Sequence, residues 1–227
     1  MSTTACSRRY FPSRLASRAF LLMLLVLCSI VDGHAETIIL QPKGEYANID
    51  TRLAKQALTK LTQGTDEERL QIIRAVTAAP QDYAPPVFYA LSSVLFASGL
   101  KDDAAFWFYA GQLRARFDAN RCNDVSARSA VGVLNDRYGA PINRYAFQNP
   151  AKLEALIERV VKWDRDTPHN YDQRWINLSG MGATTSAMGN AADASPLSLP
   201  EAQWAAIAEK TRTDYMAGLR EALKQSK

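Results

Sequence analysis

The chain of 227 residues contains 27 Lys and Arg against 23 Asp and Glu, which gives a formal net charge of +4. Residues 1–35 hold four Arg and one Asp, so the remaining residues carry a net charge of only +1. Because this remainder has no tract of Lys and Arg interleaved with aromatic residues, the composition argues against a nucleic-acid partner. The remainder is long enough for one domain with its own hydrophobic core.

The first 35 residues resemble an export signal. Basic residues at the start are followed by an apolar run over residues 19–30. Gly33 and Ala35 then offer small side chains at the positions that a signal peptidase reads, which predicts cleavage after Ala35. The apolar run is shorter than the roughly 20 residues that a membrane-spanning helix needs. We therefore expect residues 1–35 to be a signal peptide and the mature protein to be periplasmic or secreted, without a membrane span.

Two other routes of export are open at this stage. Ser7–Phe11 resembles a twin-arginine signal, whereas the very apolar run favours ordinary Sec export. Lipidation at Cys28 would need a small residue before it, and Leu27 stands there, so a lipoprotein is the less favoured alternative. Loss of the leader also removes Cys6 and Cys28. Cys122 is then the sole cysteine, which excludes an intramolecular disulfide bond in the mature chain.

About seven helices are predicted after the leader by apolar residues at helical spacing. They begin, in order, near Asp50, Thr65, Pro85, Gly99, Asp124, Asn149 and Ser198. Thr65 with Glu68 forms a capping box, and Gly64, Gly99 and Gly139 are predicted helix ends. Only residues 37–40 have the pattern of a strand. The predicted fold class is therefore all-α, with at most one short N-terminal strand.

The helix after Gly99 is expected to lie in the middle of the domain. Residues 106–109 are four consecutive aromatics, whose side chains sweep most of the way round a helix at about 100° per residue. Gln112 and Arg116, together with Ala105, form its one predicted polar strip. A helix that is apolar on two sides needs neighbours on two sides.

The spacing of the predicted helix ends suggests paired-helix repeats. Gly64, Gly99 and Gly139 are 35 and 40 residues apart, the period of such repeats. The middle unit has Ala90-Leu91, Leu95 and Gly99, followed by Asp102–Ala105 and Trp107–Ala110. Over about residues 87–116 it resembles the tetratricopeptide superfamily, in particular the Sel-like branch. The resemblance implies antiparallel helix pairs and a protein-binding function.

Residues 164–175 are the densest polar and aromatic cluster, and they contain the only histidine of the mature chain. Aromatic and arginine side chains often anchor interfaces, so the sequence predicts a binding site here. Its candidate residues are His169, Tyr171, Asp172, Arg174 and Trp175. Two alternatives are open: a hydrolase in which Asp172 orients His169 as a base, with Cys122 as a distant nucleophile, or a structural loop whose polar groups satisfy the backbone. The acidic residues do not fit a calcium-binding loop.

The sequence thus predicts a helical repeat-like domain over residues 36–178, a flexible Gly-, Ala- and Ser-rich loop over 179–198, and a C-terminal helix over 199–227 that packs on the domain. No catalytic residue, metal ligand or cofactor is assigned. The expected function is that of an exported, non-enzymatic protein that binds another protein, such as an inhibitor or immunity protein against a toxin. The alternative is a small periplasmic hydrolase that uses His169 and Asp172.

Overall fold

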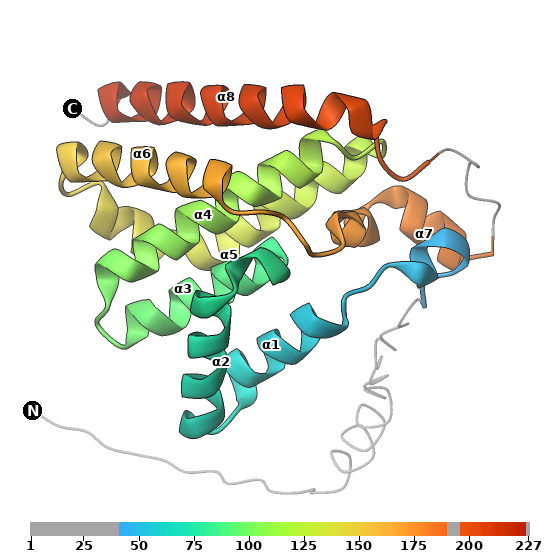
Figure 1. Ribbon diagram of the computed structural model, residues 1–227, viewed down its shortest axis with the longest axis horizontal. Coiled ribbons are helices and arrows are strands. Elements are labelled where there is room, and N and C mark those ends of the chain that lie inside the picture. Colours follow the sequence, from blue (N-terminus) through green and yellow to red (C-terminus); the bar gives the residue numbers. More distant parts are fainter. Residues whose placement is uncertain (1–40, 190–195, 226–227) are drawn as a thin grey trace, which may run out of the picture. The chain divides into compact units, whose positions relative to one another are not determined.

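A computed structural model describes residues 41–189 and 196–225. These residues form eight α-helices: α1 Arg52–Gln63, α2 Asp66–Ala78, α3 Pro85–Ala97, α4 Lys101–Asn120, α5 Ser129–Ala146, α6 Pro150–Asp166, α7 Met181–Ala187 and α8 Trp204–Gln225 (Figure 1). They also form five short 3₁₀ helices: η1 Gly44–Asn48, η2 Pro80–Asp82, η3 Val125–Arg128, η4 Gln173–Ser179 and η5 Glu201–Gln203. The all-α class is confirmed. The expected signal peptide and the expected strand at residues 37–40 lie outside the described residues.

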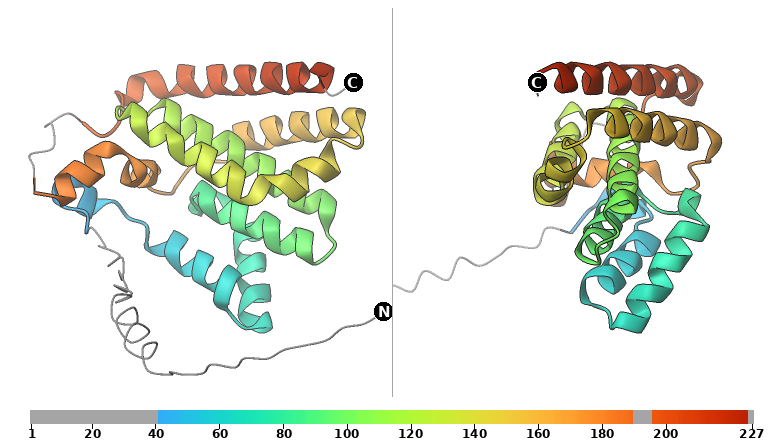
Figure 2. Two further views of the ribbon diagram at one scale, coloured as in Figure 1. Left: turned by 180° about the vertical axis from the view of Figure 1, so that it is seen from behind. Right: turned by 90° about the vertical axis from the view of Figure 1, so that its left-hand side faces the viewer.

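Helix α4 lies at the centre of the described domain. It contacts α3, α5, α6 and α8, and the two opposite views in Figures 1 and 2 show it enclosed by them. Thirteen of its twenty residues are buried. The predicted polar strip is covered as well, because α8 crosses it and the Tyr215 hydroxyl donates a hydrogen bond of 2.7 Å to Gln112 Oε1. The helix therefore has neighbours on every side, not only on the two sides that its aromatic residues predict.

A sharp turn at Gly99 joins α3 to α4. Gly99 has a φ of 81°, and its N–H donates to Phe96 O while the N–H of Leu100 donates to Leu95 O. These two bonds are those of a Schellman motif, which requires a left-handed residue at this position. Further along, a Cβ placed on Gly111 would lie 3.1 Å from Cβ of Phe88. The helices α3 and α4 therefore pack closely, and whether such pairs repeat along the chain stays a prediction.

The predicted end of α5 at Gly139 is wrong. The helix continues through Gly139 and Pro141 to Ala146. A Cβ on Gly139 would lie 3.0 Å from Cζ of Phe108, so the missing side chain lets α5 approach α4 and does not end the helix. Pro141 removes one backbone N–H from the helix, but the next residues are anchored, because Ile142 is fully buried and Asn143 Oδ1 accepts a hydrogen bond from the Tyr109 hydroxyl of α4.

The predicted flexible loop over residues 179–198 is corrected in part. Residues Met181–Ala187 of this stretch form α7. At the start of α7 the N–H of Gly182 donates a hydrogen bond to Asp124 Oδ2, and near its end Ser186 Oγ donates to the carbonyl oxygen of Lys43. Residues 190–195 lie outside the described part of the chain. Beyond them, the backbone of Leu197–Leu199 bonds that of Arg121–Asn123 and forms one isolated β-bridge. A helix this short depends on tertiary contacts, which sequence periodicity does not register.

The last helix, α8, packs against α4 and α6 (Figure 1). Its inward stripe includes the buried Thr211 and Tyr215, two of the residues that the sequence places on this face. In the part of the chain that the structure describes, no helix has both the length and the apolar character to cross a membrane.

The close packing of α3 on α4 is tested by Gly111→Val. The added side chain meets Phe88, Tyr89 and the carbonyl oxygen of Pro85 at 3.1–3.3 Å from its Cβ, so the two helices must separate. We expect a loss of about 1–3 kcal/mol in the free energy of unfolding, measured by urea denaturation. Gly132→Val is the matched control, since nothing lies within 4 Å of a Cβ on Gly132, and it should change the value by no more than about 0.5 kcal/mol. Equal losses in the two variants would contradict this packing.

Candidate functional site

Two charged residues of α4, Arg114 and Asp118, are buried in the interior of the domain. Arg114 donates through Nε to Asp164 Oδ1 at 3.1 Å and through Nη2 to the carbonyl oxygen of Thr167 at 2.8 Å. Its guanidinium also lies 4.3 Å from the ring centroid of Trp163. These contacts tie the C-terminal end of α6 to the middle of α4.

Asp164 is the centre of this ionic cluster. Besides Arg114, it accepts a hydrogen bond from Arg212 Nε at 2.8 Å, and His169 Nε2 lies 3.1 Å from its Oδ1. Burial raises the pKa of Asp164, but the hydrogen bond with His169 and the attraction of His169, Arg114 and Arg212 outweigh it and lower the pKa to about 2. One carboxylate therefore joins α4, α8 and the segment after α6.

Asp118 organises the following residues in the same way. Its Oδ2 accepts hydrogen bonds from the Tyr171 hydroxyl at 3.0 Å and from Trp175 Nε1 at 2.7 Å. Its Oδ1 accepts from Arg121 Nη2 at 2.6 Å, and the Arg121 guanidinium lies between the rings of Phe117 and Trp204. The segment that follows α6 is thus held against α4 by a second buried carboxylate.

The five predicted binding residues are for the most part engaged in internal contacts. His169 stacks on Tyr171, with 5.8 Å between the ring centroids, and its side chain is only 13% exposed. Asp172 pairs with Arg174 and accepts a hydrogen bond from the N–H of Asp50, and the Arg174 side chain is 29% exposed. Trp175 is buried. Internal contacts of this kind are what we expect if residues 164–175 form a structural loop.

The groups of the alternative hydrolase hypothesis are not joined by hydrogen bonds in the described structure. The carboxylate beside His169 is that of Asp164, whereas the carboxylate of Asp172 accepts hydrogen bonds from Arg174 and from the N–H of Asp50. Cys122 Sγ accepts from Asn177 Nδ2 at 3.0 Å and donates to the carbonyl oxygen of Asp124. Burial is the main reason that the pKa of the Cys122 thiol is raised, which leaves less of the reactive thiolate. Within residues 41–189 and 196–225, no three or more His, Cys, Asp or Glu side chains gather in a metal-binding group.

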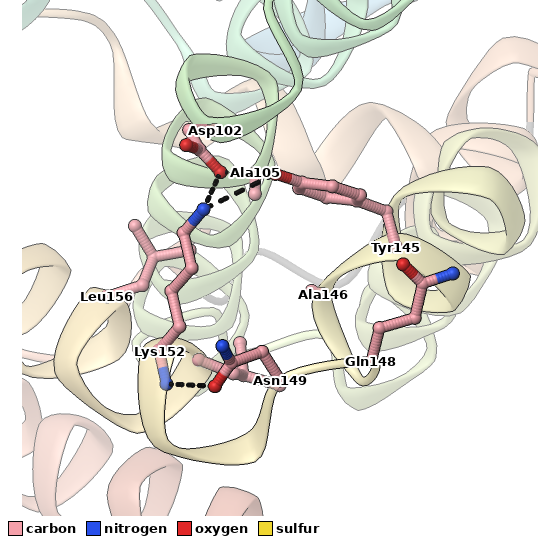
Figure 3. A pocket seen from close by; sticks show the side chains of 9 residues that line it. Asp102, Ala105, Tyr145, Ala146, Gln148, Asn149, Lys152 and Leu156 are labelled. Atoms are coloured by element: carbon pink, nitrogen blue, oxygen red, sulfur yellow. Dashed lines mark hydrogen bonds and ion pairs between the residues drawn. The ribbon is translucent and has the colours of Figure 1, made fainter.

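One surface pocket lies between α4, α5 and the start of α6. It has a volume of about 230 Å³, and Figure 3 shows Asp102, Tyr145 and Lys152 pointing toward one another at its edge. Lys152 forms an ion pair with Asp102, and the Tyr145 hydroxyl donates to the same carboxylate. The hydrogen bond with Lys152 lowers the pKa of Asp102, and that with Asp102 raises the pKa of Lys152. The polar groups thus satisfy one another.

A second pocket, of about 300 Å³, lies among α4, α5, α6 and α8, and a groove of about 310 Å³ lies between α3, α5 and η4. The groove is lined by Pro86, Ser129, Ala130, Val133, Leu134, Trp175 and Ser179. Five of these seven side chains are apolar. Trp175 is the predicted binding residue that lines it. The others were not predicted, although Val133 gives a usable signal, because it is an apolar residue off the buried stripe of its helix.

The buried ionic cluster is tested by Asp164→Asn. The substitution leaves Arg114 buried without its counter-ion, so we expect a loss of about 3–5 kcal/mol in the free energy of unfolding at neutral pH. Asp166→Asn is the matched control two residues along. Its carboxylate is exposed and pairs with the exposed Lys162, so it should cost no more than about 1 kcal/mol. Urea denaturation monitored by circular dichroism measures both.

The same residue predicts a pH dependence. Because the pKa of Asp164 is lower in the folded protein than in the unfolded chain, its contribution is complete above about pH 4 and is lost as the pH falls toward 2. A shift from 3.8 to about 2 corresponds to about 2–3 kcal/mol. Asp164→Asn should remove this part of the acid dependence. A variant whose stability falls as steeply as that of the wild type would show that other carboxylates cause it.

Comparison with family models, with curated proteins and with solved structures finds no significant match for this chain. The ionic cluster, the two pockets and the groove are therefore characterised by their own residues and geometry.

Proposed function

We propose that the protein is an exported, non-enzymatic helical protein that binds another protein, and that the groove between α3, α5 and η4 receives an apolar side chain of this partner. The observation that carries the proposal is the combination of an apolar groove with the exposed Val133 on its wall. Val133 is 64% exposed, and the ring of Trp175 lines the groove beside it. Pockets that accept an apolar anchor are typical centres of protein interfaces.

The surroundings of the groove support an interface. Four of the seven large apolar side chains that are exposed in the described structure belong to η3, α5, α7 or the residue after α7, namely Val125, Val133, Met181 and Met188. The hydrogen bond from the N–H of Met181 to Ser126 Oγ ties α7 to η3, next to the start of α5. Exposed apolar side chains gathered on neighbouring elements indicate an interaction surface.

The charge near the groove favours a partner with an acidic rim. Arg128 and Arg137 are exposed on the same stretch of chain as Val133. Neither forms an ion pair with any described residue, and the Arg137 guanidinium lies 5.3 Å from the ring centroid of Tyr138. Both guanidinium groups are therefore open to carboxylates of a partner, which would raise the rate of association and fix its orientation. An inhibitor or immunity protein that covers the active site of a toxin is the sharper form of this proposal.

The hydrolase alternative lacks a comparable observation. His169 lies between Phe117 and Tyr171, and its Nε2 is occupied by Asp164. A general base needs access to a substrate proton, and His169 does not line any of the three cavities described above. Protein binding is therefore the better supported class.

The groove is tested by photo-crosslinking followed by substitution. A photoreactive amino acid in place of Val133 should crosslink a partner in cells, whereas the same residue in place of Leu70, an exposed apolar position on α2, should not. Mass spectrometry then identifies the partner. With both proteins purified, Val133→Glu should weaken binding by at least about tenfold, because a charge must enter an apolar contact, while Leu70→Glu should not.

Both side chains are exposed, so both variants should melt within a few degrees of the wild type. Equal crosslinking from the two positions would contradict a site at the groove. Crosslinks only between copies of this chain would replace the heterologous partner with self-association. A captured enzyme whose activity falls on complex formation would support the inhibitor form.

Export is tested at the N-terminus of the mature protein. The pattern of residues 1–35 predicts that the protein recovered from the periplasm or the medium begins at Glu36. Intact mass and N-terminal peptide analysis measure this directly. A start at Cys28 with an added lipid mass would indicate a lipoprotein, and an uncleaved chain in the cytoplasm would contradict export.

A further inference from the structure

The pocket among α4, α5, α6 and α8 contains an arginine with an unusual environment. Three arginines around α4 have side chains that are at most 11% exposed, and all three have carboxylate partners: Arg114 and Arg212 pair with Asp164, and Arg121 pairs with Asp118. Arg116 is itself half-buried. Arg116, which lines this pocket, forms no hydrogen bond and no ion pair with any residue in the described ranges. Its Nη1 is buried and faces no protein acceptor. Its one contact of this kind is with the ring of Tyr215, 5.4 Å from the guanidinium carbon.

The environment of Arg116 would be stabilised by a bound anion. A guanidinium has five N–H donors and no acceptor, and it stays charged at any physiological pH. Arg114 and Arg121 also have one buried guanidinium nitrogen each without a protein acceptor, but their charges are compensated by ion pairs. Leaving a charged donor out of water without a partner costs free energy that a bound carboxylate would recover.

The other polar groups of the pocket leave room for one small anion. Asp214 lines the pocket, but its carboxylate pairs with Lys210 at 2.7 Å, which offsets its charge. Gln112 is committed on both sides, to Asn135 and to Tyr215. Asn143 accepts from the Tyr109 hydroxyl through Oδ1, while its Nδ2 donates to no described acceptor. Arg116 and Asn143 are thus the two lining side chains with a donor nitrogen that makes no hydrogen bond to a described residue, and Gln112 Nε2 has one N–H left.

The remaining lining is apolar, with Phe147, Ile157 and Leu219 among its residues. A volume of about 300 Å³ lies at the small end of the range for ligand sites. We propose that this pocket binds a small monocarboxylate whose carboxylate pairs with Arg116 and whose short apolar or aromatic body lies against Phe147 and Leu219. A phosphate ester fits less well, because the pocket offers a single arginine and a second negative charge would have no cation to pair with.

Isothermal titration calorimetry on the mature protein tests this site, with benzoate and hexanoate as probes and benzamide and hexanamide as neutral matches. The carboxylates should bind and the amides should not. Arg116→Gln should weaken binding at least tenfold, whereas Arg74→Gln, an exposed and unpaired arginine on α2, should leave it unchanged. Arg116→Lys should restore only part of the affinity, because Lys lacks the planar fork.

A second pair of variants tests the pocket without changing the arginine. Gly218 lines the pocket, and nothing lies within 4 Å of a Cβ placed on it. Gly218→Leu should therefore keep the fold, fill the pocket and reduce binding at least tenfold, whereas the matched Gly132→Leu should not. The same loss in both glycine variants, equal binding of acids and amides, or no binding of either carboxylate would overturn the proposal. Val133→Glu should leave carboxylate binding unchanged, which separates this site from the groove.

Discussion

Two buried charged residues on α4, Arg114 and Asp118, each need a partner, and this need is the constraint on which the arrangement of the domain depends. Arg114 is fully buried and Asp118 nearly so, and removing either partner from such a pair leaves a charge in the interior at a cost of several kcal/mol. Asp164 accepts a hydrogen bond from Arg114 and neutralises its charge. Tyr171 and Trp175 donate hydrogen bonds to Asp118 and stabilise its negative charge. Hydrophobic burial supplies most of the stability but has little direction. The charges determine which part of the chain covers this side of α4.

The class of the fold and most helix positions could be predicted because both depend on local patterns. The capping box at Thr65 forms with both of its hydrogen bonds, and the turn at Gly99 has the left-handed geometry that the glycine allows. The errors occur where a tertiary contact decides. Gly139 has the local signature of a helix end, but Phe108 of α4 occupies the space beside it, and the helix continues. A sequence read by periodicity alone does not contain that contact.

The candidate site was harder to predict for a related reason. A segment rich in acids, aromatics and arginine has the composition both of an interface and of a buried polar cluster, since both use charged hydrogen bonds and ring contacts. What separates them is whether partners exist elsewhere in the chain. Asp118 lies 53 residues before Tyr171, and Arg212 lies 48 residues after Asp164. No local pattern connects residues so far apart. Trp175 belongs both to the buried polar cluster and to the groove, because its Nε1 donates a hydrogen bond to Asp118 and its side chain also lines the groove.

The three charged residues at positions 114, 116 and 118 show how one helix can serve two purposes. At about 100° per residue, Arg114 and Asp118 lie within about 40° of each other, whereas Arg116 points about 160° away from each of them. The first side of α4 is neutralised by residues of its own chain and fixes Trp175 in place. The other side faces α8, where Arg116 meets the ring of Tyr215 and no carboxylate among the described residues. The pairs on the first side fix the position of α4, and with it the backbone from which Arg116 projects. A ligand at Arg116 would therefore meet a helix that is already in place, which reduces the conformational entropy that its binding would have to overcome.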